Sequence, residues 1–168
     1  MMIRLDWRAW MNRIFHCQVL ALLALLAACL GGCQTIGTIK PINLSESGWR
    51  ARQGQAVWRM PGNRPELAGE MTFAIHTNGE CFVEFSKTPF TMVLAKCGTT
   101  RWEIEFPPQK LYFAGGGTPP KRLAWLHVCN GLAGKEVAPP WRFARHTDGS
   151  WRLDNARTKE AVEGFLEP

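Results

Sequence analysis

Two runs of alternating apolar and polar residues around a glycine turn constrain the fold of this chain most strongly. They cover residues 70–76 and 80–86, with Thr77-Asn78-Gly79 between them. A two-residue turn would set the two apolar sets on opposite faces of the sheet, whereas a three-residue loop with a left-handed Gly79 aligns them. We therefore predict the three-residue loop. The core-face pairs are then Ile75 with Cys81, Phe73 with Val83, and Met71 with Phe85.

Further strands are predicted on either side of this hairpin, because apolar runs alternate there with proline and glycine clusters that favour turns. The predicted strands are residues 55–60, 90–97, 101–106 and 111–114, and a second hairpin covers 141–155. Both faces of 90–97 are largely apolar, which predicts cover on both sides. Residues 161–166 are open to a last strand or to a short helix that starts at Thr158, and Gly164 favours the strand.

One helix is predicted between the two groups of strands. Thr118 suits the N-cap, Pro119 suits the first helical position, and Asn130-Gly131 suits the end. Apolar residues cover much of the helix surface, which indicates contact on more than one side. The chain is therefore predicted to be mainly β, an α+β fold with an antiparallel sheet and one helix.

A short apolar segment precedes the predicted domain. Residues 11–35 combine a basic flank at Arg13, an apolar run over 19–30 and a small-residue ending before Cys33. This order is typical of a secretory signal, and the run is shorter than the roughly 20 residues that span a membrane. Met11 gives a more typical charged leader than Met1, so either residue is open as the start.

Leu30-Gly31-Gly32-Cys33 resembles the lipobox of bacterial lipoproteins, in which the cysteine is acylated and becomes the mature N-terminus. Leu26-Ala27-Ala28-Cys29 fits the same pattern, but the chain turns polar only after Cys33, which favours Cys33. The resemblance implies a lipid anchor in the outer membrane, facing the periplasm, because Gln34 does not match the aspartate that retains lipoproteins in the inner membrane. The predicted organisation is a signal peptide over 1–32, an acylated N-terminus and tether over 33–54, and a folded domain over 55–168.

Charge and motifs argue against several classes of function. Lys and Arg outnumber Asp and Glu by 20 to 14 but are scattered, without the basic cluster of a nucleic-acid-binding module. The sequence contains neither Gly-x-Ser-x-Gly nor His-Glu-x-x-His. His127 and Cys129 point to different sides of the predicted helix, and Glu103 and Glu105 share the polar face of one strand. We therefore predict no enzymatic activity and no cofactor.

Three cysteines fall in the predicted domain: Cys81, Cys97 and Cys129. The turn at 87–89 places Cys81 and Cys97 on one face of neighbouring strands, where Cα atoms approach to about 5.5 Å, within disulfide range. A Cys81–Cys97 disulfide is therefore a candidate, two reduced core thiols are the alternative, and the state of Cys129 is left open. No Cys-x-x-Cys or His-x-x-x-His spacing is present, so no metal site is predicted.

The segment from Pro119 to Leu126, followed by Gly131-Leu132, resembles the helix of the LolA/LolB family of periplasmic lipoprotein carriers and receptors, with its Trp-Leu and Gly-Leu pairs. The strand that begins Leu67-Ala68-Gly69-Glu70-Met71 resembles the opening strands of that family. The resemblance implies a curved sheet or incomplete β-barrel whose concave face is covered by the helix and holds acyl chains. The apolar pocket residues that it suggests, which are open to a role as ordinary core, are Met92, Leu94, Trp102, Leu123, Trp125 and Leu126.

The expected function is that of a membrane-anchored periplasmic lipoprotein that binds lipid or lipoprotein acyl chains in this apolar half-barrel. Its expected partners are the membrane, through the acylated N-terminus, and a lipid or lipoprotein ligand, with no nucleic acid. The alternative is a structural or protein-interaction lipoprotein of the envelope with a filled core. A continuous apolar cavity favours the first function, and a fully packed interior favours the second.

Overall fold

The computed structural model describes residues 38–62 and 64–168. The described residues form one compact unit. The predicted signal peptide, both candidate acylation sites at Cys29 and Cys33, and the first residues of the tether lie outside the described residues.

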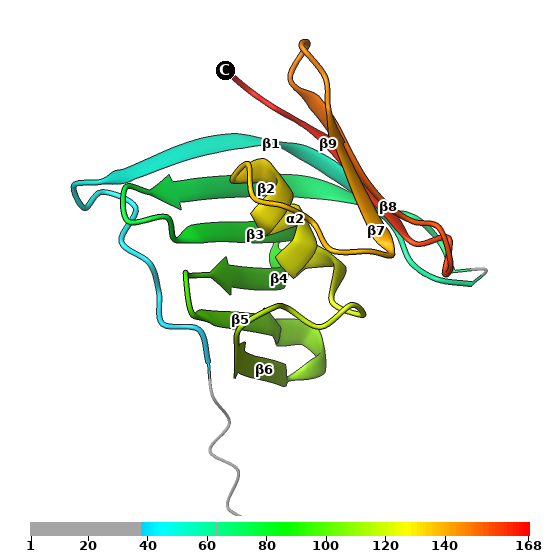
Figure 1. The fold of residues 1–168 in the computed structure, drawn as a ribbon, viewed down its shortest axis with the longest axis horizontal. Helices are drawn as coiled ribbons and strands as arrows, with labels where there is room; N and C mark the ends of the chain where they lie inside the picture. Colours follow the sequence, from blue (N-terminus) through cyan, green and yellow to red (C-terminus); the bar gives the residue numbers. More distant parts are fainter. Residues whose placement is uncertain (1–37, 63) are drawn as a thin grey trace, which may run out of the picture. The chain divides into compact units, whose positions relative to one another are not determined.

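In the described residues, nine antiparallel strands form one sheet in the order β6-β5-β4-β3-β2-β1-β9-β8-β7, accompanied by the α-helix α2 (Ala124–Leu132) and a short 3-10 helix at Pro107–Gln109 (Figure 1). The mainly β prediction is therefore confirmed. The strands are β1 (Trp49–Arg59), β2 (Leu67–His76), β3 (Cys81–Lys87), β4 (Phe90–Cys97), β5 (Arg101–Phe106), β6 (Leu111–Gly116), β7 (Trp141–Arg145), β8 (Ser150–Asn155) and β9 (Ala161–Leu166).

Both hairpins have the predicted three-residue loop. The amide of His76 donates to the carbonyl of Glu80 at 2.8 Å, and Gly79 has a φ of 86°. In the second hairpin, the amide of His146 donates to the carbonyl of Ser150 at 2.9 Å. The predicted core-face pairs are confirmed: Ile75 with Cys81, Phe73 with Val83, and Met71 with Phe85. In the second hairpin, Phe143 lies opposite Leu153.

The first strand begins earlier than predicted. β1 starts at Trp49, six residues inside the predicted tether, and pairs with β2 from Trp49 opposite His76 to Trp58 opposite Leu67. Residues 49–54 alternate only weakly and are mostly polar, so their pattern does not indicate a strand. The last strand, β9, pairs with the other edge of β1, so the strand prediction for residues 161–166 is confirmed.

The helix is shorter than predicted at its start and longer at its end. Residues 119–123 form a turn, in which the amide of Leu123 donates to the carbonyl of Pro120 at 3.0 Å, and α2 begins only at Ala124. Gly131 does not end the helix. A side chain at Gly131 would meet the Phe143 ring, with atoms 2.5 Å from an added Cβ, so glycine permits close packing there. Gly134, with a φ of 74°, provides the left-handed residue that ends the helix.

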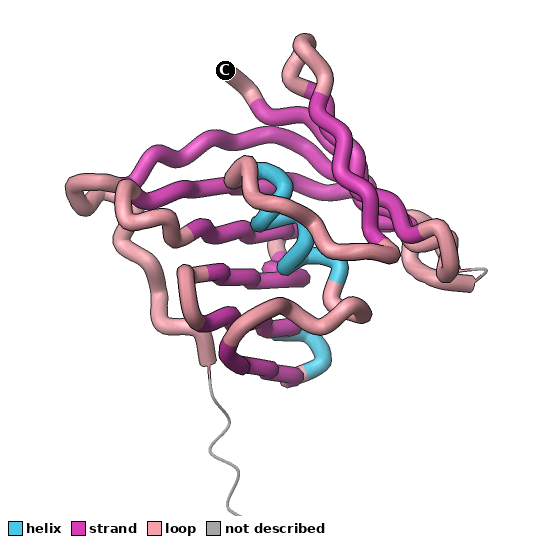
Figure 2. Tube along the Cα trace, in the orientation of Figure 1, coloured by secondary structure: helices cyan, strands magenta, loops and turns pink. Residues whose placement is uncertain are grey.

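Strands from both halves of the sheet contact α2. The helix touches β3, β4 and β5, and it also touches β7, β8 and β9. Eight of its nine residues are buried, which agrees with the prediction of contact on more than one side. Figure 2 shows the helix between two loop segments, one on each side along the chain.

The predicted cover of β4 on both faces is wrong at its start. Val93, Ala95 and Cys97 are buried, whereas Phe90, opposite Lys87 at the start of the strand, is 65% exposed. Phe90 is the first residue of β4 and follows directly on the β3–β4 turn. Near β5, the face of the sheet turned away from α2 is partly covered, because Ile39 is buried and its amide donates to Glu105 at 2.9 Å.

Candidate functional site

The interior beneath α2 is dominated by aromatic rings. Trp125, on the first turn of the helix, is fully buried. Its ring stacks on Phe85 of β3, with centroids 4.7 Å apart, and meets the edge of Trp58 of β1 at 5.7 Å. Aromatic pairs in these arrangements add to the stabilisation from burial. The helix is thereby fixed to the strands at the middle of the sheet.

The structure brings most of the predicted pocket residues together, but as packed core. Trp102, Leu123, Trp125 and Leu126 are buried in one hydrophobic cluster. Met92 packs against that cluster because the β3–β4 register shifts beside it, leaving Met92 without a partner on β3.

Leu94 was predicted to line the same pocket, and this is wrong. It pairs with Glu84 and Glu105, on the face of the sheet turned away from α2. The reason is the alternation of β4, which gives the face toward the helix to Val93 and Ala95.

Three tryptophans in the interior carry an unusual feature. The indole nitrogens of Trp102, Trp125 and Trp151 are buried without a hydrogen-bond partner among the described residues. The indole nitrogens of Trp58 and Trp141, by contrast, donate to Glu160 Oε1 at 3.0 Å and to the carbonyl of Lys121 at 2.6 Å. A buried donor without an acceptor costs about 1 to 3 kcal/mol. The three free donors are therefore the polar groups that a ligand entering this interior could satisfy.

Glu160 is a buried carboxyl group that sequence patterns did not indicate. Its side chain is held beside Trp58, and burial raises the pKa of this carboxyl, while the hydrogen bond from Trp58 opposes the rise. A group whose pKa is higher in the folded than in the unfolded state favours folding in acid. Its contribution is lost as the pH rises through the folded-state pKa.

We expect Glu160→Gln to be more stable than the wild type at pH 7, because the amide oxygen still accepts the Trp58 hydrogen bond and no buried charge forms. The difference should shrink toward zero below a pH of about 4.3, the ordinary pKa of glutamate. Urea unfolding of both proteins between pH 4 and pH 8 measures this. Glu163→Gln is the control, because Glu163 pairs with Arg59 and Arg152 and its neutralisation removes attractions. A stability difference independent of pH would contradict the prediction.

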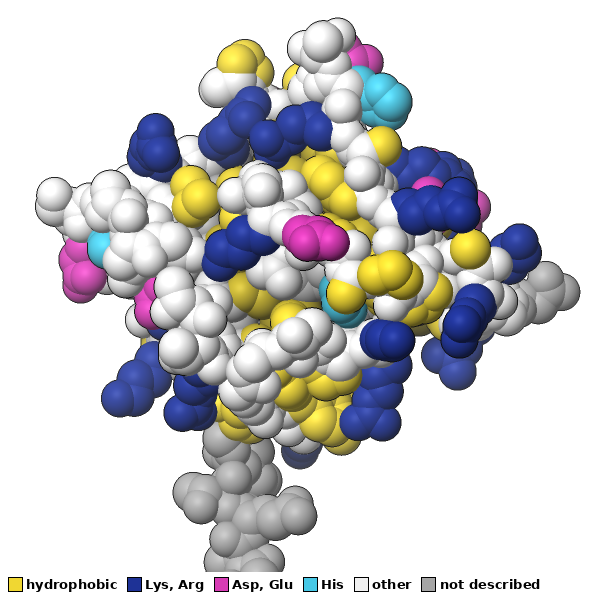
Figure 3. All heavy atoms as spheres, in the orientation of Figure 1, with side chains coloured by type: hydrophobic (Ala, Val, Ile, Leu, Met, Phe, Trp, Pro, Cys, Tyr) yellow, Lys and Arg dark blue, Asp and Glu magenta, His cyan; other side chains and the backbone are white. Residues whose placement is uncertain are grey.

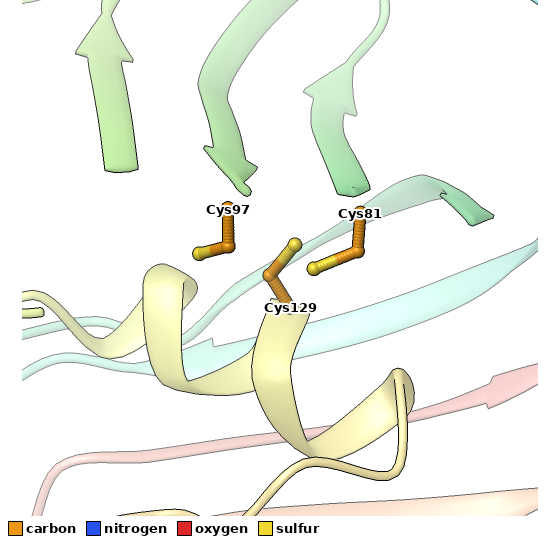
Figure 4. Close-up of side chains that lie close together, drawn as sticks. All are labelled: Cys81, Cys97 and Cys129. Carbon is orange, nitrogen blue, oxygen red and sulfur yellow. The ribbon is translucent and has the colours of Figure 1, made fainter. Parts of the chain in front are cut away.

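The three cysteines of the domain meet in one place beneath the helix (Figure 4). Cys81 and Cys97 lie directly opposite each other on β3 and β4, which confirms their predicted shared face. Cys129 on α2 points toward both, and the three sulfur atoms lie within 4.8 Å of one another. All three are buried free thiols in the structure, and the Cys81–Cys97 disulfide stays a prediction. Cys129 was not assigned to this cluster from sequence, because its partners lie on other elements.

The thiols of this cluster differ in acidity. Hydrogen bonds from Cys129 and Cys97 lower the pKa of the Cys81 thiol to about 4, and the Lys135 ammonium adds to the effect. Burial raises the pKa of the Cys129 thiol well above its ordinary value. Cys81 is therefore the most acidic of the three thiols.

The residues considered for acid–base chemistry lie apart from one another. His127 is buried with Nε2 3.2 Å from the carbonyl of Pro120, and burial lowers the pKa of its imidazole. Cys129, two residues farther along the same helix, belongs to the thiol cluster instead. Glu103 forms an ion pair with Arg101, and Glu105 accepts the Ile39 amide. The structure assembles none of these into a nucleophile–base pair within residues 38–62 and 64–168.

The surface hollows lie away from the predicted pocket residues. One of about 400 Å³ lies over β1, β8 and β9 and is lined by side chains that include Val57, Arg152, Glu163 and Phe165. Others of about 310 and 320 Å³ lie over β1, β2 and β3. None of these hollows is lined by the six predicted pocket residues. Figure 3 shows Lys and Arg side chains scattered over the visible face without forming a continuous patch.

Comparison with known proteins gives no information on the function of this site. The chain matches no protein-family model and no curated protein. Among the helices of the described part of the chain, none has the length and apolarity that crossing a membrane requires.

Proposed function

We propose that this protein is an envelope lipoprotein that binds acyl chains between the sheet and α2, in the manner of the LolA/LolB family. In this proposal the sheet is an incomplete β-barrel, and α2 covers its concave face. Cys33 carries the lipid anchor that holds the domain at the periplasmic face of the outer membrane.

The observation that carries the proposal is the set of three unpaired indole donors on Trp102, Trp125 and Trp151. They lie in an interior otherwise lined by apolar side chains, which is the composition typical of a site for an apolar ligand with a few polar groups. The ester or amide carbonyls of a lipid or of an acylated N-terminus are acceptors for such donors. A bound acyl group would therefore satisfy donors that are costly in the empty protein.

Acyl chains can enter this interior only if α2 moves. The helix is nine residues long, and the segments on either side contain glycines with positive φ, Gly117 and Gly134. Such residues allow a connecting segment to change its backbone direction at small cost. In our proposal α2 is the cover that opens for the ligand and packs back in its absence.

The alternative function, a structural or interaction lipoprotein with a filled core, is favoured by a different observation. The predicted pocket residues on the α2 side are close-packed, and the hollows described above lie outside them. In that case the unpaired indole donors are a cost of the fold, and the protein would act through its surface.

Photo-crosslinking in living cells separates the two functions. A benzoylphenylalanine at Trp125 is expected to capture lipid or lipoprotein acyl chains, detected as a mass increase on the peptide that contains residue 125. The matched control places the same group at Phe165, which is 42% exposed and lies over the surface hollow. Acyl adducts at 125 but not at 165 support the carrier function. Crosslinks to other parts of this chain alone at 125, in a folded protein, would favour the filled core.

A further inference from the structure

We propose that Cys81, Cys97 and Cys129 form a three-sulfur binding site for a soft monovalent metal ion, Cu(I). The site goes beyond the acyl-binding proposal and does not depend on it. Two of its ligands come from neighbouring strands and the third comes from the helix that packs on them (Figure 4).

The spacing of the sulfur atoms suits one ion at their centre. A metal–thiolate bond is about 2.3 Å long, so three sulfurs in a plane around one ion lie about 4 Å apart. The three sulfur atoms here lie within 4.8 Å of one another before any ion is present. A small inward rotation of the side chains is enough to reach bonding distance.

The ligand set selects the kind of metal. Thiolates favour soft ions such as Cu(I), whereas Mg²⁺ and Ca²⁺ require oxygen ligands. Structural zinc is bound almost always by four ligands. Among the described residues, the cluster contains no fourth His, Cys, Asp or Glu, and its three members are 0%, 2% and 0% exposed, which leaves no open side for a water ligand. Three-coordinate Cu(I) fits a closed three-sulfur site better than zinc does.

The surroundings hold the ligands in position. Cys81 and Cys97 are directly paired across two strands, which fixes the separation of their backbones. Lys135, beyond the end of α2, donates from Nζ to the carbonyl of Gly79 at 2.8 Å and joins the helix end to the β2–β3 turn. Its positive charge also offsets part of the negative charge of a thiolate site.

Binding needs no oxidant or reductant. Each copper–sulfur bond forms at a deprotonated sulfur, any sulfur that still carries a proton releases it to solvent, and copper stays Cu(I) throughout. Binding should therefore weaken as the pH falls, because protons compete with the metal for the sulfurs.

The test uses the full chain with Cys17, Cys29 and Cys33 replaced by serine, so that only the three cluster thiols remain. The protein is purified in mild detergent without oxygen and titrated against the coloured Cu(I) complex of bicinchoninate. We expect it to withdraw one Cu(I) per chain, and X-ray absorption should show three sulfur neighbours at about 2.3 Å.

Serine variants identify the ligands. Cys81→Ser, Cys97→Ser and Cys129→Ser should each lose the one-equivalent step, while Ala124→Ser, on the same buried helix but outside the cluster, should retain it. The X-ray absorption of the parent protein keeps the test decisive if a variant fails to fold. No withdrawal of copper by the folded parent, or a copper ion with fewer than three sulfurs, would overturn the proposal. A Cys81–Cys97 disulfide in wild-type protein isolated from cells without reductant would overturn it as well.

Discussion

Replacing Trp125 with alanine is expected to destabilise the domain by about 3 to 5 kcal/mol, the cost of removing a large aromatic side chain from a core. The ring is fully buried between Phe85 and Trp58, so its removal leaves a cavity and breaks two aromatic contacts. Urea unfolding of the wild type and the variant, followed by circular dichroism, measures the loss.

Trp49→Ala is the matched comparison for Trp125→Ala. Trp49 is only half-buried and contacts His76 at the edge of the domain, with ring centroids 5.0 Å apart, so its loss should be clearly smaller. If Trp125 instead lines a ligand-binding interior, the variant should lose acyl-chain binding with a smaller loss of stability. Equal destabilisation by the two substitutions would contradict a special role for Trp125 in fixing α2 to the sheet.

Cys33→Ser is expected to abolish acylation and to release the protein from membranes into the soluble periplasmic fraction. The expectation rests on Leu30-Gly31-Gly32-Cys33, since serine has no thiol to carry the lipid. Burial of acyl chains contributes about 0.8 kcal/mol for each methylene group, so loss of the anchor removes most of the membrane affinity. Palmitate labelling and membrane fractionation measure the two effects.

Cys29→Ser is the control for the anchor, because it leaves Cys33 in place and should be acylated normally. A Cys33→Ser protein that still incorporates palmitate, together with a Cys29→Ser protein that does not, would assign the anchor to Cys29. Membrane association of the Cys33→Ser protein without any label would indicate that the uncleaved leader holds it there.

Local patterns were sufficient to predict most of the sheet. The loop around Gly79 fixed the register of β2 and β3, because only one loop length aligns the two apolar sets. The bounds of β4 and β5 follow from the turn clusters on either side of each strand. The edges of elements depend on tertiary contacts that a local pattern lacks. Asn130-Gly131 predicts a helix end from its local sequence, whereas Gly131 lies inside α2 and allows the Phe143 ring to pack closely against it.

The candidate site was predicted less well, because its members come together only in three dimensions. The shared face of Cys81 and Cys97 followed from strand pairing, but Cys129 joins them through helix packing that no spacing reveals. The Trp58–Glu160 hydrogen bond joins β1 to the turn before β9, and neither residue stands out locally. The unpaired indole nitrogens likewise depend on which acceptors the fold leaves within reach.

The pairing of β1 with β9 has a consequence for how the chain becomes a folded protein. Every other neighbouring pair of strands in the sheet is consecutive along the sequence. β1 and β9 are the exception, and their pairing sets Gly54 opposite Leu166. Contacts between distant segments form slowly, and an unpaired strand edge is a site for association with other chains. Until β9 has been synthesised, the open edge of β1 is therefore the point at which a chaperone would protect the nascent protein and at which aggregation would begin.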